Sequence, residues 1–276
     1  MQNIENGQNN AMHECKQSAF VFDFKTLLAD SKGYCDLSAQ AAPTIGAVMR
    51  SRIEQLSRLS KGAVAIIGNQ DLSLLRHSLN EQLDDCHLVG SNGAEMLVPG
   101  GQKIADPLDI ATHQLRRSVR TFAQKFENVS VRHTSYAIQI DASKSSESLA
   151  ELNIGLNRIV DNASAQIQMY CESPYWEIKS ALLNNGLALA KLMDHPHFHG
   201  RKLYFFGDTN RGEPAYLVTK LASGHSIRVG KLDLSSRADF AIQTHSELKN
   251  WLGRLCDEHR IPKLVAKDTL ADEIAA

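Results

Sequence analysis

The sequence predicts an α/β fold: a doubly wound, mostly parallel sheet that is interrupted by an inserted α+β cap. Short apolar runs alternate with amphipathic segments at helical spacing, which is typical of parallel strands joined by helices. Asp23 and Asp208 follow two of the most apolar runs. Functional groups of open α/β sheets gather where strands end. Between these aspartates, over 107–180, the pattern changes to long helices and closely spaced short strands.

The first part of the core covers residues 18–106. Its apolar runs predict strands at 19–22, 63–67 and 87–89, with helices over 43–59 and 71–83 between them. The run Gly90-Ser91-Asn92-Gly93-Ala94-Glu95 has the glycine spacing of a structural turn. Pro99-Gly100-Gly101 then predicts a hairpin between 96–98 and 102–104.

The insert, 107–180, is predicted to be a small cap of helices and strands. The core pattern returns over 181–262, where Leu203 to Phe206 is the most apolar strand. We expect flexible tails at 1–17 and 263–276, because both ends lack the periodic pattern. In the cap we predict helices at 107–126 and 145–161, and strands at 129–132, 136–140, 167–170 and 175–178.

Composition narrows the function classes. The chain has 30 Lys+Arg against 31 Asp+Glu and no basic block, which argues against a nucleic-acid partner. It has neither a run of membrane-spanning length nor the apolar segment of a signal peptide, so we expect no membrane partner. The scattered cysteines form no Cys-x-x-Cys pair, which indicates reduced thiols and a cytoplasmic location. They are Cys15, Cys35, Cys86, Cys171 and Cys256.

The most informative run is Ala-Phe-Val-Phe-Asp-Phe-Lys-Thr, which contains Asp23 and Lys25. An aspartate after a buried strand, with a second aspartate two residues later, would indicate phosphoryl transfer through an aspartyl-phosphate. Lys25 stands at that second position. The run therefore begins like a phosphatase motif and departs from it at the residue that would act as general acid and base.

Further motifs follow in a defined order: Ala-Val-Ala-Ile-Ile, Gly-Ser-Asn-Gly-Ala-Glu, Trp-Glu-Ile-Lys, Phe-Phe-Gly-Asp, Ile-Arg-Val-Gly and a late Trp-Leu pair. From about Ala19 to Leu255 the chain thereby resembles the trehalose-6-phosphate phosphatases of the haloacid-dehalogenase (HAD) superfamily. The resemblance implies a HAD-like core with an inserted cap. It also implies an Mg²⁺-dependent phosphatase whose nucleophile is Asp23.

The first two motifs depart from that family. The family reads Asp-x-Asp-Gly-Thr, so Lys25 replaces the acid/base, and its ammonium would compete with Mg²⁺ for the same carboxylates. The second motif, Ser-Gly-Arg in the family, is Gly68-Asn69-Gln70 here. Backbone amides at Gly68 and the Asn69 side chain are then the remaining candidates for contacting a phosphate.

The last two motifs have also lost groups. By register from Glu177-Ile178-Lys179, the phosphate-neutralising lysine of the third motif falls on Asn185. The fourth motif, Gly-Asp-Asp-x-x-Asp-Glu in the family, keeps only Asp208 and Glu213. The resemblance thus implies Asp23, Asp208 and Glu213 as metal ligands of a weak or absent Mg²⁺ site, and Mg²⁺ is a doubtful cofactor.

The cap differs most. The family's sugar-contacting His-Tyr-Arg run aligns with Gln139-Ile140-Asp141, so an acid replaces the cation. Of the family's Gly-Lys-x-Val-x-Glu-Ile-Lys pattern, Glu177 carries over as a substrate contact. Lys179 matches the last lysine of the pattern.

The leading interpretation is a cytoplasmic pseudophosphatase of trehalose metabolism with a binding or regulatory role. Its expected ligand is trehalose 6-phosphate or another sugar phosphate, and its expected partner a trehalose-6-phosphate synthase or an active paralogue. One alternative is an active Mg²⁺-dependent phosphatase acting through Asp23, with a cap residue such as Glu172 as acid/base. Another is a phosphatase for a different, smaller substrate.

A histidine-rich segment stands apart from these motifs. His195, His197 and His199 alternate around Pro196. Alternating histidines can ligate Zn²⁺, but the spacing offers no fourth ligand, so the sequence alone assigns no metal site here.

Overall fold

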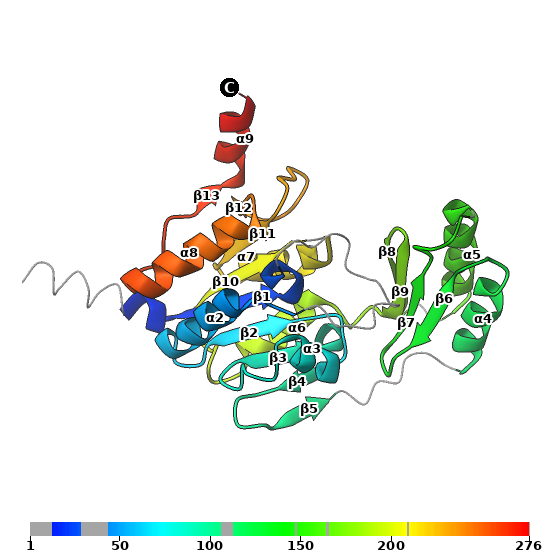
Figure 1. Cartoon of the computed structure of the whole chain (residues 1–276), viewed down its shortest axis with the longest axis horizontal. Coiled ribbons are helices and arrows are strands. Elements are labelled where there is room, and N and C mark those ends of the chain that lie inside the picture. The colour runs from blue at the N-terminus through cyan, green and yellow to red at the C-terminus, as the bar shows by residue number, and fades with distance from the viewer. Residues whose placement is uncertain are drawn as a thin grey trace, which may run out of the picture. The chain divides into compact units, whose positions relative to one another are not determined.

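The computed structural model describes residues 13–28, 44–105, 113–146, 148–163, 166–208 and 210–275. They divide into two compact units. The first, the core, comprises the described residues up to 105 and from 184 onward, and the second, the cap, comprises those between 113 and 183. Figure 1 shows both, with the core in blue, cyan and yellow to red and the cap in green. Each unit is considered separately.

The core is built on a nine-stranded sheet of order β13-β12-β11-β10-β1-β2-β3-β4-β5. The six central strands, from β12 to β3, run parallel, and the edge strands β13, β4 and β5 join antiparallel. The predicted doubly wound, mostly parallel sheet is therefore confirmed. The strands are β1 Ser18–Asp23, β2 Val64–Ile67, β3 His87–Gly90, β4 Glu95–Leu97, β5 Lys103–Ala105, β10 Lys202–Gly207, β11 His225–Val229, β12 Phe240–Ile242 and β13 Val265–Ala266.

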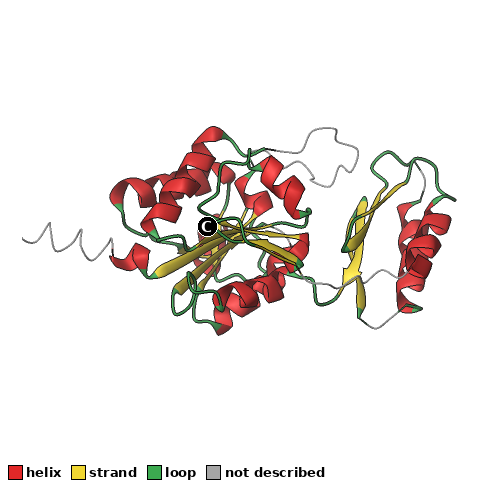
Figure 2. Ribbon diagram, turned by 90° about the horizontal axis from the view of Figure 1, so that it is seen from below, coloured by secondary structure: helices red, strands yellow, loops and turns green. Residues whose placement is uncertain are grey.

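Strands β1 and β10, at the centre of the sheet, are apolar along most of their length, since both faces of the sheet are covered there. Their rings stack across the pair, Phe22 on Phe206 at 4.7 Å and Phe20 on Tyr204 at 5.2 Å between centroids. Helices cover both faces of the sheet (Figure 2). The sheet centre is thus fixed by packing, which holds the ends of β1 and β10 side by side.

Three core helices, α3, α6 and α8, begin at a polar side chain that caps the first turn. Asp71 accepts a hydrogen bond from the Leu74 N–H at 2.8 Å and starts the helix predicted there, although that helix ends at Ser78. The helix at 213–221 has no counterpart in the sequence prediction; Pro214 lies in its first turn, where its missing N–H costs nothing. The helices are α2 Ala47–Leu59, α3 Leu72–Ser78, α6 Asn185–Met193, α7 Glu213–Leu221, α8 His245–Glu258 and α9 Lys267–Ala275, with 3₁₀ turns η1 Phe24–Leu27, η2 Ser91–Gly93 and η3 Asn210–Gly212.

Both chain ends differ from the predicted tails where they are described. Residues 13–16 are helical, and Cys15 among them is fully buried. At the other end, β13 pairs with β12 and α9 follows, with Leu270 buried. The few apolar residues of these short segments do not recur at a regular helical or strand spacing. The sequence therefore predicted tails rather than secondary structure. Residues 1–12 lie outside the described part.

The cap unit is a four-stranded antiparallel sheet, of order β6-β7-β9-β8, covered by two helices. Val119, Ile138, Leu156 and Trp176 are among the side chains of its own core. None of the helices described in either unit has the length and apolar character needed to cross a membrane. The cap elements are α4 His113–Ala123, β6 Ser130–His133, β7 Ala137–Asp141, α5 Leu149–Asp161, β8 Ile167–Glu172 and β9 Tyr175–Ser180.

Candidate functional site

The carboxyl edge of the core sheet brings together the first and third predicted motifs. Asp23 is the last residue of β1, is 7% exposed, and starts η1. Its Oδ1 accepts a hydrogen bond from the Lys25 N–H at 3.2 Å, and its Oδ2 accepts one from the Asn185 Nδ2 at 2.9 Å. Asn185 is the first residue of α6 and is 4% exposed. Both carboxylate oxygens are therefore engaged by groups of this chain.

Nearby cations offset only part of the free-energy cost of burying a negative charge on Asp23. Burial is the main influence and raises the pKa of Asp23 above its ordinary value. Lys25, half-buried on η1, and then Arg211 of η3 act in the opposite direction without cancelling the effect of burial. Arg211 stands inside the altered fourth motif, and sequence reasoning gave it no role.

The buried Tyr216 lies close enough to Asp23, Asp208 and Glu213 for their charges to affect its pKa. The pKa of Tyr216, on α7, is raised well above its ordinary value, first by burial and then by the charges of Asp23, Asp208 and Glu213, against the influence of Arg228. Its hydroxyl has no hydrogen-bond partner among the described residues. A Cβ on Gly207 would lie 2.7 Å from that hydroxyl, so glycine is needed there. Sequence reasoning missed Tyr216, because α7 was not predicted.

Asp208 directly follows β10, the neighbour of β1, as expected from the motif order. Glu213 begins α7, and its carboxylate is held by a loop. Ser236 Oγ donates to its Oε1 at 2.6 Å, and the Arg237 N–H donates to its Oε2 at 2.8 Å. Arg228 lies 3.8 Å from Oε1. The structure thus gives Glu213 a role in fixing the 228–237 segment.

The second motif follows β2, and its glycine is enclosed. The Gly68 N–H donates to the Val89 carbonyl at 2.8 Å, and the Gly68 carbonyl accepts from the Asn92 N–H at 3.0 Å. A Cβ on Gly68 would lie 2.5 Å from Gln70 Oε1. The Gly68 amide is therefore committed to the sheet, whereas Asn69 beside it is half-buried.

The cap carries the predicted substrate contact Glu177 on β9. Its Oε2 forms an ion pair with Lys179 Nζ at 3.0 Å, and both side chains are 2% exposed. Lys179 also lies over the Tyr170 ring, 4.6 Å from its centroid, and Gln139 Nε2 approaches Glu177 Oε1 at 3.5 Å. Glu177 is thus part of a buried charged group within the cap sheet. Glu172, named as an alternative acid, is exposed at the end of β8.

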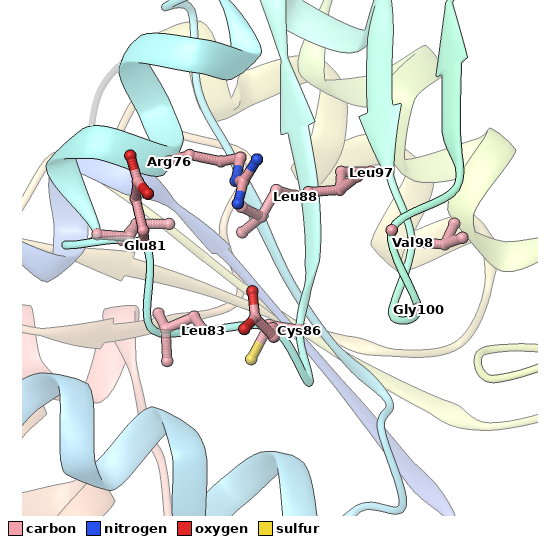
Figure 3. A pocket seen from close by; sticks show the side chains of 11 residues that line it. Arg76, Glu81, Leu83, Cys86, Leu88, Leu97, Val98 and Gly100 are labelled. Carbon is pink, nitrogen blue, oxygen red and sulfur yellow. The ribbon is translucent and has the colours of Figure 1, made fainter.

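The core has two pockets that Asp23 does not line. One, of about 350 Å³, opens between the end of α3 and the β4–β5 hairpin and is drawn in Figure 3, where Arg76, Cys86 and Leu97 line it. Another, of about 660 Å³, is lined by Leu27 of η1 and by the start of α8, including His245. The His245 Nε2 lies 3.3 Å from the Lys25 carbonyl, which places this second pocket next to η1.

No known protein-family model matches the sequence, and no curated protein matches it. The architecture, in contrast, has solved counterparts. The C-terminal domain of C. albicans trehalose-6-phosphate phosphatase matches with a TM-score of 0.70 and 14% identity, over 91% of this chain and 95% of that one. The trehalose-6-phosphate phosphatase of Aspergillus fumigatus matches with a TM-score of 0.63 and 13% identity, over 91% and 97%.

A third counterpart is the C-terminal domain of a Candida albicans trehalose synthase regulatory protein, with a TM-score of 0.66 and 11% identity over 89% and 97% of the two chains. A haloacid dehalogenase-like hydrolase from Bacteroides thetaiotaomicron also matches, with a TM-score of 0.61 and 12% identity over 86% and 99%. The chain therefore has a HAD-like fold. This is the fold that the solved trehalose-6-phosphate phosphatases share, as the motif order predicted.

Proposed function

We propose that this chain is a pseudophosphatase. It is a trehalose-phosphatase-like protein that binds a ligand or regulates a partner and does not hydrolyse a phosphate ester. The observation that carries the proposal is the 2.9 Å hydrogen bond from Asn185 Nδ2 to Asp23 Oδ2. The resemblance implies a lysine at position 185, which would neutralise a substrate phosphate. A neutral amide there engages the nucleophile position and supplies no positive charge.

The acid/base position supports the same conclusion. An ammonium, as at Lys25, has no lone pair with which to activate water. Loss of a general acid/base alone costs roughly 10²- to 10⁴-fold in rate. Loss of the lysine removes electrostatic stabilisation of the transferring phosphoryl group in addition.

We further infer that the residues at this edge do not fit Mg²⁺. Magnesium requires near-octahedral oxygen ligation. Both oxygens of Asp23 and both of Glu213 already accept hydrogen bonds from the chain, while Lys25 and Arg211 place positive charge beside Asp23. The carboxylate of Asp208 alone supplies too few oxygen ligands for this ion.

The proposed ligand is trehalose 6-phosphate or another sugar phosphate, and the proposed partner is a trehalose-6-phosphate synthase or an active paralogue in the cytoplasm. The likeness to a trehalose synthase regulatory protein supports a regulatory role. The retained architecture of both units supports a binding role, because loss of catalytic groups leaves the fold intact.

A phosphate-release assay tests the proposal. Purified chain is incubated with Mg²⁺ and trehalose 6-phosphate, next to Asp23→Asn as the matched control. We expect equal, background release from both. Calorimetry on the same samples, with trehalose 6-phosphate as titrant, tests binding independently of turnover.

Mg²⁺-dependent release by the parent chain that Asp23→Asn abolishes would overturn the proposal and establish the active-phosphatase alternative. In that event Glu172→Gln would show whether the exposed cap carboxylate is the acid/base. Release that persists in Asp23→Asn would come from a contaminating phosphatase and would leave the parent at background.

A further inference from the structure

Three histidines meet at the edge of the core sheet opposite to Asp23. His87 is the first residue of β3, whereas Asp23 is the last residue of β1, and these strands run in the same direction through β2. His195 and His197 lie between α6 and β10. One ring nitrogen from each of the three histidines can be chosen such that all lie within 4.8 Å of one another. Among the described residues, these three histidines are the metal-ligating side chains whose ligand atoms lie within this distance of one another.

The ring arrangement is close to that of a metal site. The centroids of His87 and His195 are 4.6 Å apart, those of His87 and His197 5.1 Å, and those of His195 and His197 5.2 Å. Three imidazoles bound tetrahedrally at the usual Zn–N distance of about 2.0–2.1 Å would have centroids about 5 Å apart. The three ring centres are therefore spaced as ligation of one shared ion requires.

The buried ring has unused hydrogen-bonding capacity. His87 is fully buried, and no hydrogen bond of good geometry reaches either of its ring nitrogens within the described part of the chain, although the backbone groups of Val64 and Gly62 lie close enough to raise its pKa. Nδ1 of His197 is likewise buried without a hydrogen-bond partner there. A buried polar atom without a partner costs about 1–3 kcal/mol. Coordination would use a lone pair that the protein leaves unsatisfied.

Burial also favours the neutral ring form that a metal requires. Burial, followed by the neighbouring His195 and His197, lowers the pKa of His87 to about 3, while the backbone groups of Val64 and Gly62 act in the opposite direction. Burial and then His197 also lower the pKa of His195. A neutral imidazole keeps the lone pair that binds a metal, whereas a protonated one cannot bind.

The backbone holds this geometry in place. The His195 carbonyl accepts hydrogen bonds from the Phe198 N–H at 2.8 Å and the His199 N–H at 3.0 Å, which closes a tight turn. Gly62 approaches from the turn before β2 with φ of +82°, and a Cβ there would lie 3.3 Å from His197 Nδ1. His195 Nδ1 accepts only a long hydrogen bond, 3.4 Å, from the His197 N–H, so reorientation of this ring costs little.

We propose that His87, His195 and His197 form a binding site for a divalent transition-metal ion of the Zn²⁺ type. Imidazole nitrogen suits Zn²⁺, Cu²⁺ and Ni²⁺, in contrast to the oxygen donors that Mg²⁺ prefers. His195 and His197 are partly exposed, which gives the ion a path from solvent and leaves a fourth position for water. His199, exposed on the same turn, lies outside the cluster.

The competing interpretation is a purely aromatic cluster. The His87 ring also meets the Phe198 ring edge-on, at 4.9 Å, so neutral histidines here would contribute packing alone. The two interpretations differ in what they predict for metal ions added to the apo protein.

The test uses the full chain, freed of metal by a chelator. Titration with Co²⁺ is followed by visible absorption, which is intense for tetrahedral and weak for octahedral cobalt. Zn²⁺ binding is measured by competition with a chromogenic chelator and by thermal shift. We expect one equivalent, a tetrahedral cobalt spectrum, and a melting temperature that rises with Zn²⁺ concentration.

Variants assign the ligands. His195→Ala and His197→Ala should each weaken Zn²⁺ binding at least tenfold, since even outer-shell partners of a metal account for 10- to 100-fold. His199→Ala is the matched control and should keep full affinity. The result for His87→Ala is interpreted only if circular dichroism shows that the variant is folded. The variants of His195 and His197, which are partly exposed, are sufficient to assign the ligands.

Two results would overturn the proposal. The first is no Zn²⁺-dependent thermal shift and no tetrahedral cobalt spectrum in the parent chain, which establishes the aromatic cluster. The second is equal binding by the parent and the His195→Ala/His197→Ala double variant, which places the ion elsewhere. These readouts are independent of phosphate release, so the proposed function and the metal site can fail separately.

Discussion

At the scale of single residues, Asp23 shows how the groups around a buried carboxylate determine its environment. Its carboxylate ends β1 and is buried, yet its hydrogen bonds come from Lys25 and Asn185, at positions where the resemblance implies an acid/base and a phosphate-binding lysine. In the pseudophosphatase that we propose, these two residues make the carboxylate part of an internal polar network. The energetic consequence can be measured without any substrate.

Asp23→Asn should stabilise the chain at neutral pH. Because burial raises the pKa of Asp23, its stabilising contribution is complete below its ordinary pKa of about 3.9 and is lost as pH rises through the folded-state pKa. The amide avoids that loss. Urea unfolding should show a gain on the order of 1 kcal/mol at pH 7 that vanishes near pH 3.5. A variant less stable than the parent at pH 7 would contradict this account of Asp23.

Lys25→Ala should destabilise the chain in metal-free buffer. Lys25 lowers the pKa of Asp23, so its removal leaves the buried carboxylate less compensated at neutral pH. We expect a fall in melting temperature of about 2–4 °C for each kcal/mol lost. Lys61→Ala, an exposed lysine on the turn before β2, is the control and should change little.

The same site tests the replacement of metal by lysine. Lys25→Asp should weaken the apo protein and then gain stability from millimolar Mg²⁺, since an ion that binds only the folded state stabilises it by mass action. The parent chain should gain none. A strong Mg²⁺ shift in the parent would contradict the inference that its carboxylates do not fit this ion.

The residues that could be predicted were those whose place follows from strand order. Asp23 and Asp208 end neighbouring parallel strands, and counting from the Glu-Ile-Lys run placed Asn185 beside the same edge. Tyr216, Arg211 and His87 could not be found this way. Each acquires its neighbours only through tertiary packing, and His87 lies 108 positions before His195 in the chain.

At the scale of elements, the 90–95 turn illustrates a motif kept for packing. A Cβ on Gly90 would lie 2.7 Å from the Leu72 backbone nitrogen, at the start of α3. Glu95 Oε2 accepts hydrogen bonds from the Leu72 N–H at 3.1 Å and Ser91 Oγ at 3.0 Å, and Lys103 lies 2.8 Å from Oε1. Burial would raise the pKa of Glu95, but these partners together hold it below its ordinary value.

Gly93→Ala should therefore be more costly than an ordinary turn substitution. Gly93 has φ of +101°, and its added Cβ would lie 2.8 Å from the Ala188 Cβ on α6. Gly100→Ala is a matched control, because Gly100 has φ of +92° with nothing within 4 Å. Urea unfolding should show the same backbone penalty in both variants and a further 1–3 kcal/mol, roughly, from overpacking in Gly93→Ala. Equal losses would mean that the contact with α6 is unimportant.

Most elements could be predicted because their apolar runs are continuous. Strands β1, β2, β3 and β10 were located to within one or two residues, and Asp71 marked the start of α3. The helix α7 was not predicted; it begins at Glu213, within the altered fourth motif. Residues 107–112, which were included in the predicted cap helix, lie outside the described part of the chain, and α4 begins at His113.

At the scale of the whole molecule, each unit has a core of its own. We propose that the predicted cap, 107–180, folds independently, because its helices bury Val119 and Leu156 against Ile138 and Trp176 of its sheet. An isolated 107–180 fragment should unfold cooperatively in urea and give dispersed amide resonances. A fragment with the spectrum of a disordered chain would show instead that the cap depends on the core.

The pairing of β1 with β10 has a consequence for how the chain is made. β1 ends at residue 23 and β10 begins at residue 202, so one central strand leaves the ribosome 179 residues before its partner. At 5–20 residues per second, that interval is roughly 10 to 40 s. The strand Ser18–Asp23, among the most apolar in the protein, spends this time without the neighbour that will cover one of its edges. Nascent chains should therefore depend on chaperones until residue 207 emerges, and ribosome-bound intermediates that stop before it should be the aggregation-prone ones.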